Sequence, residues 1–260
     1  MSSPLPDQQT TSIAVSTPDD VFIRDKSLCH ELIGKLTFTE MLHFGILGRL
    51  PTPPQTKLID ACLVTLMEHG LTPSALATRL IYSSANEAMQ AAVAAGLLAV
   101  GSRFVGTTEG CGALLTRMIA TADHDAEAKR IVTEFRASRS PVPGFGHPFH
   151  KPDDPRSIRL LALAREEGIA GAHIAAVESL GRAIDESFGK HITLNATGAV
   201  AAVLGDCGVP SEILRGFALI ARCAGLVGHV HEEQKKPAMR VIWETAERAV
   251  PYDGQAGNAD

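Results

Sequence analysis

The apolar residues of this chain recur at helical spacing, and the segments that carry this pattern are divided by Pro, Gly and Thr signals. No sustained stretch alternates apolar and polar side chains as a half-buried strand would. We therefore predict an all-α fold of about ten to twelve helices. The helices are expected over Thr37–Leu50, Thr56–His69, Thr72–Tyr82, Asn86–Val100, Glu109–Ala122, Ala126–Ser138, Ser157–Glu167, Ala172–Phe188, Ala196–Asp206, Ser211–His231 and Pro237–Ala249.

Alanine is concentrated in two of these segments, Asn86–Val100 and Ala196–Asp206. Small side chains let two helix backbones approach closely. We therefore expect these two helices at the centre of the helical bundle or at a subunit interface.

The composition, 45% hydrophobic and 20% charged residues among 260, is that of a globular protein able to bury a sizeable core. The net charge of −5 gives no long-range attraction to nucleic acid or to an anionic membrane, so neither is an expected partner. Five widely spaced cysteines without a C-x-x-C pair predict free thiols in a reducing compartment. The first residues lack a signal-peptide pattern, and the most apolar run, Ala91–Val100, reaches only about half a membrane span, which predicts a cytoplasmic protein.

The stretch from Pro143 to Arg156 carries the strongest signal for chemistry. Two glycines precede His147 and permit tight turns that bring the imidazole and backbone amides close to a ligand. The prolines of this stretch stiffen the loop, which also contains Lys151. A stiff loop with a histidine, a lysine and an arginine suits recognition of a polycarboxylate or a phosphate. By spacing alone, a Pro-rich connector in which His147 caps a helix is equally compatible.

Four segments form an ordered set of motifs. They are Glu68-His69-Gly70 with Ala77-Thr78-Arg79, Gly144-Phe145-Gly146-His147 with Lys151 and Asp154-Pro155-Arg156, Leu194-Asn195-Ala196-Thr197-Gly198, and Arg222-Cys223-Ala224-Gly225 with His229. Over roughly residues 30–245 the chain thereby resembles the citrate synthase superfamily. Its length is more similar to the compact citryl-CoA lyase type, which is itself similar to the lyase module of ATP-citrate lyase.

The resemblance implies a citrate synthase-like helical domain over residues 21–253. A smaller part at about residues 141–190 would close over the active site, and the site would be completed across a homodimer. Residues 1–20 and 254–260 are polar and show no periodicity, which predicts flexible tails.

The resemblance also implies roles for individual residues. His147 would contact the carbonyl of oxaloacetate or the tertiary hydroxyl of a citryl group, and would take the hydroxyl proton during cleavage. Arg156 and Arg222 match two arginines that clamp substrate carboxylates, and His69 matches a histidine that hydrogen-bonds the same acid. Arg240 resembles, at looser spacing, an arginine that reaches into the partner's site, but a solvated helix residue is equally compatible.

Coenzyme A, as part of the substrate, is expected to contact the same loop. Gly144 and Gly146 would bring backbone amides close to it, and Lys151 is better placed for its phosphates than the Lys235-Lys236 pair. The resemblance implies no metal and no redox cofactor. His229 is expected to be a structural, hydrogen-bonded residue rather than a metal ligand.

Three positions depart from the pattern of the synthases. Thr197 stands where synthases carry the aspartate that deprotonates acetyl-CoA, and a hydroxyl is no base near neutral pH. The stretch Val105–Gly112 lacks the histidine that stabilises the enol, and Pro148 replaces an arginine that helps to hold CoA. Glu109 is a candidate for the missing base; the favoured alternative is that it supports the first turn of a helix.

The expected function is therefore a carbon–carbon lyase that cleaves a citryl-CoA-type 3-hydroxyacyl-CoA to acetyl-CoA and a 2-oxo acid such as oxaloacetate. Its partners would be a CoA thioester with a di- or tricarboxylate group and a second copy of the chain. One alternative is synthase-like condensation of acetyl-CoA with a 2-oxo acid. The other is a non-catalytic paralogue that binds CoA esters or polycarboxylates.

Overall fold

The computed structural model describes residues 9–102 and 104–253, so the tail expected over residues 254–260 lies outside the described part. Within these residues the fold has eleven α-helices, two short turns of other helix types and three short strands, which confirms the all-α prediction. The bounds are β1 Ala14–Ser16, β2 Val21–Ile23, β3 Lys26–Ser27, η1 Leu28–Leu32, α1 Phe38–Leu47, α2 Pro53–Met67, α3 Pro73–Ser84, α4 Met89–Leu98, α5 Thr107–Ile119, α6 His124–Ala137, α7 Pro155–Glu166, α8 Ala172–Phe188, α9 Ala196–Asp206, η2 Ser211–Ile213, α10 Leu214–Lys235 and α11 Met239–Ala249.

Helix α2 begins earlier than the sequence analysis expects, at Pro53 rather than at Thr56. Thr52 caps it, because its side chain accepts the amide hydrogen of Gln55 while the Gln55 side chain accepts that of Thr52. Pro53 and Pro54 occupy the first helical positions, where a backbone amide has no intrahelical acceptor to lose. The Pro-rich segment therefore starts a helix.

The three strands form a small antiparallel sheet that precedes the helices, in the order β1-β2-β3. Strand β1 lies within residues 1–20, where the sequence analysis expects a tail; it pairs with β2 through Ala14 opposite Ile23. Thr17 closes the turn between them, since its amide and its hydroxyl both donate to the carbonyl of Asp20, at 2.8 and 2.9 Å. Pairing of this kind uses the backbone, so the periodicity of the side chains does not reveal it.

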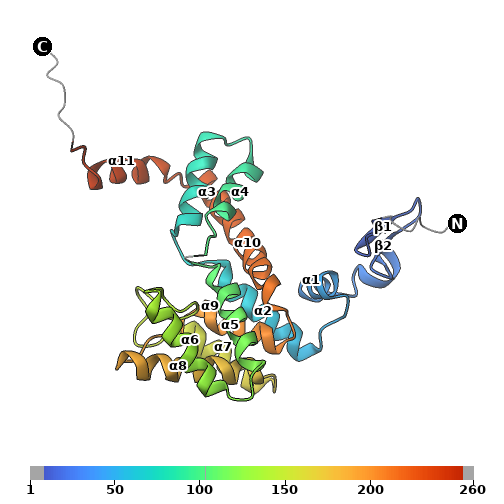
Figure 1. Ribbon diagram of the computed structural model, residues 1–260. Helices are drawn as coiled ribbons and strands as arrows, with labels where there is room; N and C mark the ends of the chain where they lie inside the picture. The colour runs from blue at the N-terminus through green and yellow to red at the C-terminus, as the bar shows by residue number, and fades with distance from the viewer. Residues whose placement is uncertain (1–8, 103, 254–260) are drawn as a thin grey trace, which may run out of the picture.

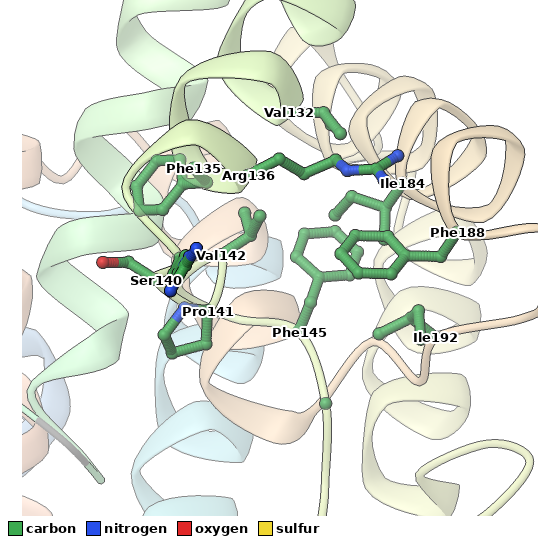
Figure 2. A pocket seen from close by; sticks show the side chains of 12 residues that line it. Val132, Phe135, Arg136, Ser140, Pro141, Val142, Phe145, Ile184, Phe188 and Ile192 are labelled. Atoms are coloured by element: carbon green, nitrogen blue, oxygen red, sulfur yellow. The ribbon is translucent and has the colours of Figure 1, made fainter.

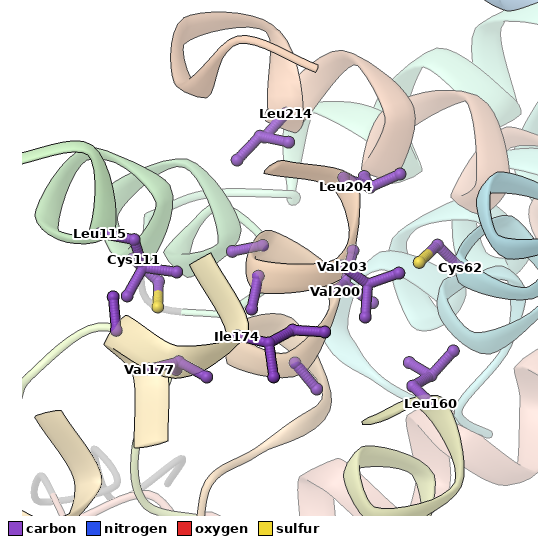
Figure 3. Close-up of a cluster of buried hydrophobic side chains, with 14 of the residues drawn as sticks. Cys62, Cys111, Leu115, Leu160, Ile174, Val177, Val200, Val203, Leu204 and Leu214 are labelled. Atoms are coloured by element: carbon purple, nitrogen blue, oxygen red, sulfur yellow. The ribbon is translucent and has the colours of Figure 1, made fainter. Parts of the chain in front are cut away.

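Helix α9 runs through the main hydrophobic core (Figure 3). Every residue from Gly198 to Gly205 is buried, and helices α2, α5, α7 and α8 pack around them. Side chains such as Val200 and Leu204 are fully buried, and each contributes about 1.5–3 kcal/mol relative to an exposed position. The expectation that Ala196–Asp206 lies at the centre of the bundle is confirmed.

The other alanine-rich segment forms α4, which packs against α3 and α10. Its buried residues Ala92 and Val93 join Leu226 and Val230 of α10 in a second, smaller hydrophobic cluster. Leu98, on another side of α4, is exposed. Helix α4 therefore lies beside the main core rather than at its centre.

The stretch Ser211–Lys235, which contains α10, is long and apolar enough to cross a membrane by length and composition. Half of its most apolar window is buried inside the protein, against α2, α3, α4 and α5. The core helix of a soluble protein has the same properties, so the stretch is weak evidence for a membrane span.

Two parts of the chain extend away from the helical body (Figure 1). The strands and α1 lie on one side, and α11 projects on the opposite side. Helix α11 has no buried residue, and its Val241 and Trp243 are exposed. These two parts therefore leave apolar surface uncovered in the single chain.

The segment before α7 contacts α9 where two backbones meet at glycine. Gly144 has a φ of +87°, and a Cβ placed on it would lie 2.7 Å from Cys111 Sγ and 2.9 Å from the Cα of Gly198. Gly146 has a similar φ of +85°, but nothing lies within 4 Å of the place where its Cβ would stand. Both positions favour glycine for their backbone conformation, and Gly144 also requires it for space.

This contrast gives a matched pair of variants. Gly146→Ala should lower the free energy of unfolding by about 1–2 kcal/mol, the cost of a left-handed conformation alone. Gly144→Ala should lower it by about 2–5 kcal/mol, because overlap with Cys111 and α9 adds to that cost. Urea denaturation of both variants and the wild type measures the difference, and equal losses would contradict the close packing of the loop against α9.

Candidate active site

The loop that contains His147 is fixed along the segment preceding α9. The Gly146 amide donates to the Thr193 carbonyl at 2.7 Å, and the Asn195 amide donates to the Gly144 carbonyl at 3.0 Å. The Asn195 side-chain amide donates to the Gly146 carbonyl at 2.9 Å. The two glycines therefore shape the loop. Contact with CoA stays a prediction for both, and the Gly146 amide is already used within the protein.

Asp154 is a buried carboxylate at the start of α7. It holds Arg156 in a two-pronged ion pair, with Arg156 Nε 3.0 Å from Oδ1 and Nη2 2.8 Å from Oδ2. It also accepts the amide hydrogen of Ala196 at 3.1 Å, which connects the start of α7 to the start of α9. Burial alone would raise the pKa of Asp154, but the hydrogen bonds from Arg156 outweigh it and hold this pKa below its usual value.

His147 meets hydrogen-bond donors at both ring nitrogens. Its Nδ1 accepts the amide hydrogens of Phe149 and His150, at 3.1 and 2.9 Å, and Arg156 Nη2, which can only donate, lies 3.4 Å from its Nε2. Burial lowers the pKa of His147, and the neighbouring His150 and Arg156 lower it further, which favours the neutral ring. The role of His147 as the group that takes the hydroxyl proton stays a prediction.

The side chains of His69 and His150 lie beside His147. The ring centroids are 4.4 Å apart for His147 and His150, 5.7 Å for His69 and His147, and 5.9 Å for His69 and His150. One potential ligand atom from each ring lies within 4.8 Å of the others. A histidine that binds a metal normally donates its second ring N–H to an acceptor, whereas His147 meets two amide donors there. The two amide donors at Nδ1 therefore do not suit a metal site at His147.

Arg222 is a buried cation of α10 with unsatisfied donors. Its Nε and Nη1 are buried without a hydrogen-bond partner, and its nearest anion is Glu68, whose Oε1 lies 3.9 Å from Nη1. Burial lowers the pKa of Arg222; Glu68 opposes this, and the nearby Arg156 adds to it. Buried guanidinium donors left unpaired are costly. An anion that entered this site would satisfy them.

Glu68 belongs to a network of charged and polar side chains. His229 Nε2 lies 2.9 Å from Glu68 Oε2, and His229 Nδ1 accepts from Arg79 Nε at 2.9 Å. Arg79 is buried and also donates to Glu233 Oε2 at 2.7 Å. Because an arginine always donates, His229 must carry its proton on Nε2, facing Glu68. The expectation that His229 is a structural, hydrogen-bonded residue is confirmed.

Thr197 lies in the first turn of α9 and faces the first turn of α5. Its Oγ1 lies 2.7 Å from Thr107 Oγ1 and 2.6 Å from Asn195 Oδ1. The Thr107 hydroxyl in turn donates to the carbonyl of Phe104 at 2.6 Å. Both hydroxyl hydrogens therefore have acceptors within the protein, and this pair supplies no base where the resemblance places an aspartate.

The other two predicted groups lie away from the three histidines. Glu109 is in the first turn of α5, as the favoured alternative expects, and its Oε2 lies 2.7 Å from Arg215 Nε. This ion pair occupies the carboxylate, which weakens the hypothesis that Glu109 is the missing base. Arg240 is on α11 with an 87% exposed side chain and pairs with Glu244 at 2.8 Å. Within the single chain Arg240 does not reach the site, so its role across a dimer stays a prediction.

A cavity of about 540 Å³ lies on another side of the loop (Figure 2). It is bounded by α6, α8 and the loop, and Phe145 points into it. At its edge the guanidinium of Arg136 lies 5.4 Å from the centre of the Phe188 ring. The lining is mostly apolar, and of the predicted site residues only Gly146 contributes to it. The cavity therefore does not form the carboxylate-binding part of the site.

The structure unites His69, His147, Arg156 and Arg222, and it adds residues that the sequence analysis does not single out. These are Glu68, Thr107, His150 and Asp154. Asp154 was detectable, because an Asp directly before a Pro is a helix start signal. The histidine three residues after His147 was also visible in the printed sequence, but spacing in a loop does not place two rings side by side.

Comparisons with known proteins match this arrangement. The family described as "Citrate synthase, C-terminal domain" matches residues 26–243. The chain is 28% identical over 189 residues to a putative citrate synthase 2 of Mycobacterium tuberculosis, covering 71% of this chain and 49% of that protein. It is 24% identical over 210 residues to the ATP-citrate synthase beta chain protein 1 of Arabidopsis thaliana, covering 73% and 33%. The chain thus spans about half the length, or less, of these curated relatives.

Two solved structures superpose well. The citryl-CoA lyase from Hydrogenobacter thermophilus gives a TM-score of 0.86 at 32% identity, over 97% of each chain. The ATP citrate lyase from Methanosaeta concilii, solved with (3S)-citryl-CoA, gives 0.74 at 18% identity, over 98% of this chain and 43% of that one, and shares the fold. The family match, which covers most of the chain, agrees with the motifs and with the helical architecture. The chain belongs to the citrate synthase family.

Proposed function

We propose that the protein cleaves a citryl-CoA-type 3-hydroxyacyl-CoA to acetyl-CoA and a 2-oxo acid such as oxaloacetate. The observation that carries this proposal is Arg222, whose buried Nε and Nη1 lack partners, with Arg156 nearby. A di- or tricarboxylate would supply the missing acceptors. The similarity to a citryl-CoA lyase at 32% identity over nearly the whole chain supports the choice of reaction.

The acid would be recognised by two guanidinium groups and two imidazoles. Arg156 is preoriented by Asp154, and Arg222 is preoriented by burial, so little side-chain entropy is lost when a carboxylate binds. His147 would contact the hydroxyl of the thioester and take its proton during cleavage, and this oxygen becomes the carbonyl oxygen of the 2-oxo acid. His69, whose ring faces both arginines, would donate to the same acid.

The absence of a base at position 197 slows enolate chemistry in both directions, so the choice of cleavage rests on the similarity to a citryl-CoA lyase. Condensation starts by removing a weakly acidic methyl proton from acetyl-CoA, which requires a positioned base. Thr197 is hydrogen-bonded to Asn195 and Thr107 and offers none. Cleavage instead starts at the hydroxyl of the substrate. We expect CoA to enter as part of that substrate, with Lys151 near its phosphates and without a resident metal or redox cofactor.

Replacement of Arg222 tests the carboxylate site. Arg222→Lys keeps the charge but loses the planar fork, so binding of citrate and of oxaloacetate should weaken by about 1.5–3 kcal/mol. Arg159→Lys is the matched control, because Arg159 is exposed on α7 and pairs with Glu166. Isothermal titration calorimetry compares them. Unchanged affinity for both acids in the Arg222 variant would remove this residue from the pocket.

The reaction itself is tested by incubating the purified protein with citryl-CoA and following the release of oxaloacetate. We expect cleavage, little citrate formation from acetyl-CoA and oxaloacetate, and a loss of about a hundredfold or more in His147→Ala, which removes the imidazole that acts on the hydroxyl. Neither cleavage nor condensation, with CoA esters still bound, would favour the non-catalytic paralogue.

The direction of the chemistry is tested by proton exchange. In deuterated water the wild type should exchange the methyl protons of acetyl-CoA slowly, because Thr197 is no base. Thr197→Asp restores a carboxylate and should raise the exchange rate measured by nuclear magnetic resonance. Rapid exchange in the wild type would mean that another base exists, with Glu109 the first to test, and would support the condensing alternative.

We also propose that the protein forms a homodimer, because α11 and the strands leave apolar surface uncovered. Sedimentation velocity at micromolar concentration should give a dimer or a higher multiple of the 27.5 kDa chain. A fully active monomer would exclude a site shared between subunits and, with it, the proposed role of Arg240.

A further inference from the structure

The two arginines of the site meet their nearest carboxylates in different ways. Asp154 bonds Arg156 through both oxygens, at 3.0 and 2.8 Å. Glu68 approaches Arg222 without bonding it: its Oε1 lies 3.9 Å from Nη1, and the buried Nε and Nη1 of Arg222 have no hydrogen-bond partner. Glu68 therefore places a negative charge beside these donors and leaves them available to a ligand.

The position of Glu68 is fixed by the close approach of the end of α2 to α10. Glu68 is the first residue after α2 and has an extended backbone, with a φ of −142° and a ψ of 149°. A Cβ placed on Gly225 of α10 would lie 2.1 Å from the carbonyl oxygen of Met67 and 3.0 Å from Glu68 Oε2, so the approach requires glycine there. Arg222, Gly225 and His229 are three and four residues apart, and so share one face of α10. The Glu68 carboxylate lies across that face, between the arginine and the histidine.

Two contacts hold the Glu68 carboxylate in this place. Its Oε1 accepts the amide hydrogen of His69 at 2.7 Å, and its Oε2 lies 2.9 Å from His229 Nε2. Burial alone would raise the pKa of Glu68, but these contacts and the charge of Arg222 outweigh it and hold this pKa below its usual value. Glu68 is therefore ionised near neutral pH, and its own contacts keep it from closing the gap to Arg222.

An acid that bonds the free donors of Arg222 would meet the charge of Glu68. Like charges a few ångströms apart repel, and in water each such pair lowers affinity by about threefold. The Glu68 side chain is 42% exposed, so solvent moderates the repulsion without removing it. The repulsion grows with the charge of the acid. Free citrate is a tricarboxylate, whereas a citryl thioester has one of these groups esterified and uncharged.

We propose, resting on the function proposed above, that Glu68 is a specificity-determining residue. Its carboxylate repels the extra charge of a free tricarboxylate and thereby favours the thioester, which has one carboxylate fewer. Arg156 and Arg222 bind both kinds of ligand, and Glu68 lowers the affinity for the more highly charged one. Free citrate then competes weakly with citryl-CoA, and the 2-oxo acid product leaves the site more readily.

Removal of this charge tests the role. In Glu68→Gln the calorimetric affinity at low salt should rise about threefold for oxaloacetate and about tenfold for citrate, because the more highly charged acid is freed from more repulsion. Citrate should also inhibit citryl-CoA cleavage more strongly, with an inhibition constant that falls by a larger factor than KM. The gain in affinity should shrink between about 10 mM and 1 M salt, since ions screen the repulsion.

Three further variants separate charge from structure. Glu68→Asp keeps the charge on a shorter side chain and should show no gain in affinity, whereas Glu68→Asn, neutral at the same length, should bind both acids more tightly than Glu68→Asp. Glu232→Gln is the matched control: it removes a carboxylate that pairs with Arg79, about 15 Å along α10 from Arg222, and should keep wild-type affinity. A merely structural Glu68 would weaken acid binding in all three of its variants and without dependence on salt. That result, or an equal gain in Glu232→Gln, would overturn our proposal.

The proposed function and the role of Glu68 fail in different ways. If the wild type neither binds these acids nor cleaves citryl-CoA, the proposed function is wrong, and the role of Glu68 falls with it. If the wild type does both, and the neutral variants of Glu68 are folded by circular dichroism but gain no affinity for citrate, the function stands and the role of Glu68 is wrong.

Discussion

The buried carboxylate of Asp154 is the interaction on which the site depends. It caps α7, orients Arg156 through two bonds, and accepts the amide hydrogen of Ala196 at the start of α9. A buried charge is tolerated only when it is fully paired, so these bonds must form together. The helix that carries Arg156 and the helix that carries Thr197 are therefore held in one geometry by a single side chain. Removing it would leave Arg156 without its anion and two helix starts without a common acceptor.

Only one of the two arginines in the site has a close counterion. Arg156 has an internal counterion, whereas Arg222 meets Glu68 only at 3.9 Å and keeps two donors unpaired. Burial lowers the pKa of Arg222, and Arg156 adds to this effect while Glu68 opposes it. Burial also leads the lowering of the pKa values of His69 and His147, and nearby arginines contribute to it. A bound acid would bring a negative charge to Arg222 and the histidines and would oppose the lowering of their pKa values. The charge of the substrate would thereby be coupled to the protonation of the histidines.

Much of the fold could be predicted from the sequence, because its signals are local. Helix α1 falls within the expected segment Thr37–Leu50, whereas α2 begins at Pro53, three residues before the expected start at Thr56. Strand β1 was missed because its pairing uses the backbone. The order of the motifs predicted the four residues that meet in the site, which are His69, His147, Arg156 and Arg222. Sequence could not give the donors that face both ring nitrogens of His147, or the pairing of Glu109 with Arg215, which lies on another element.

The Thr107–Thr197 pair shows why a site without the aspartate of the synthases can still be active. A carboxylate in the first turn of α9 would sit near the enolate that cleavage releases, and two negative charges at close range repel. Two hydroxyls at the starts of α5 and α9 are neutral, and both helix starts carry positive dipole ends that favour a developing anion. Asn195 keeps Thr197 in place through its side chain and at the same time holds the carbonyl of Gly146, next to His147. Because both hydroxyl hydrogens are donated within the protein, on the proposed function the positive helix starts, rather than the hydroxyls, would favour the departing enolate.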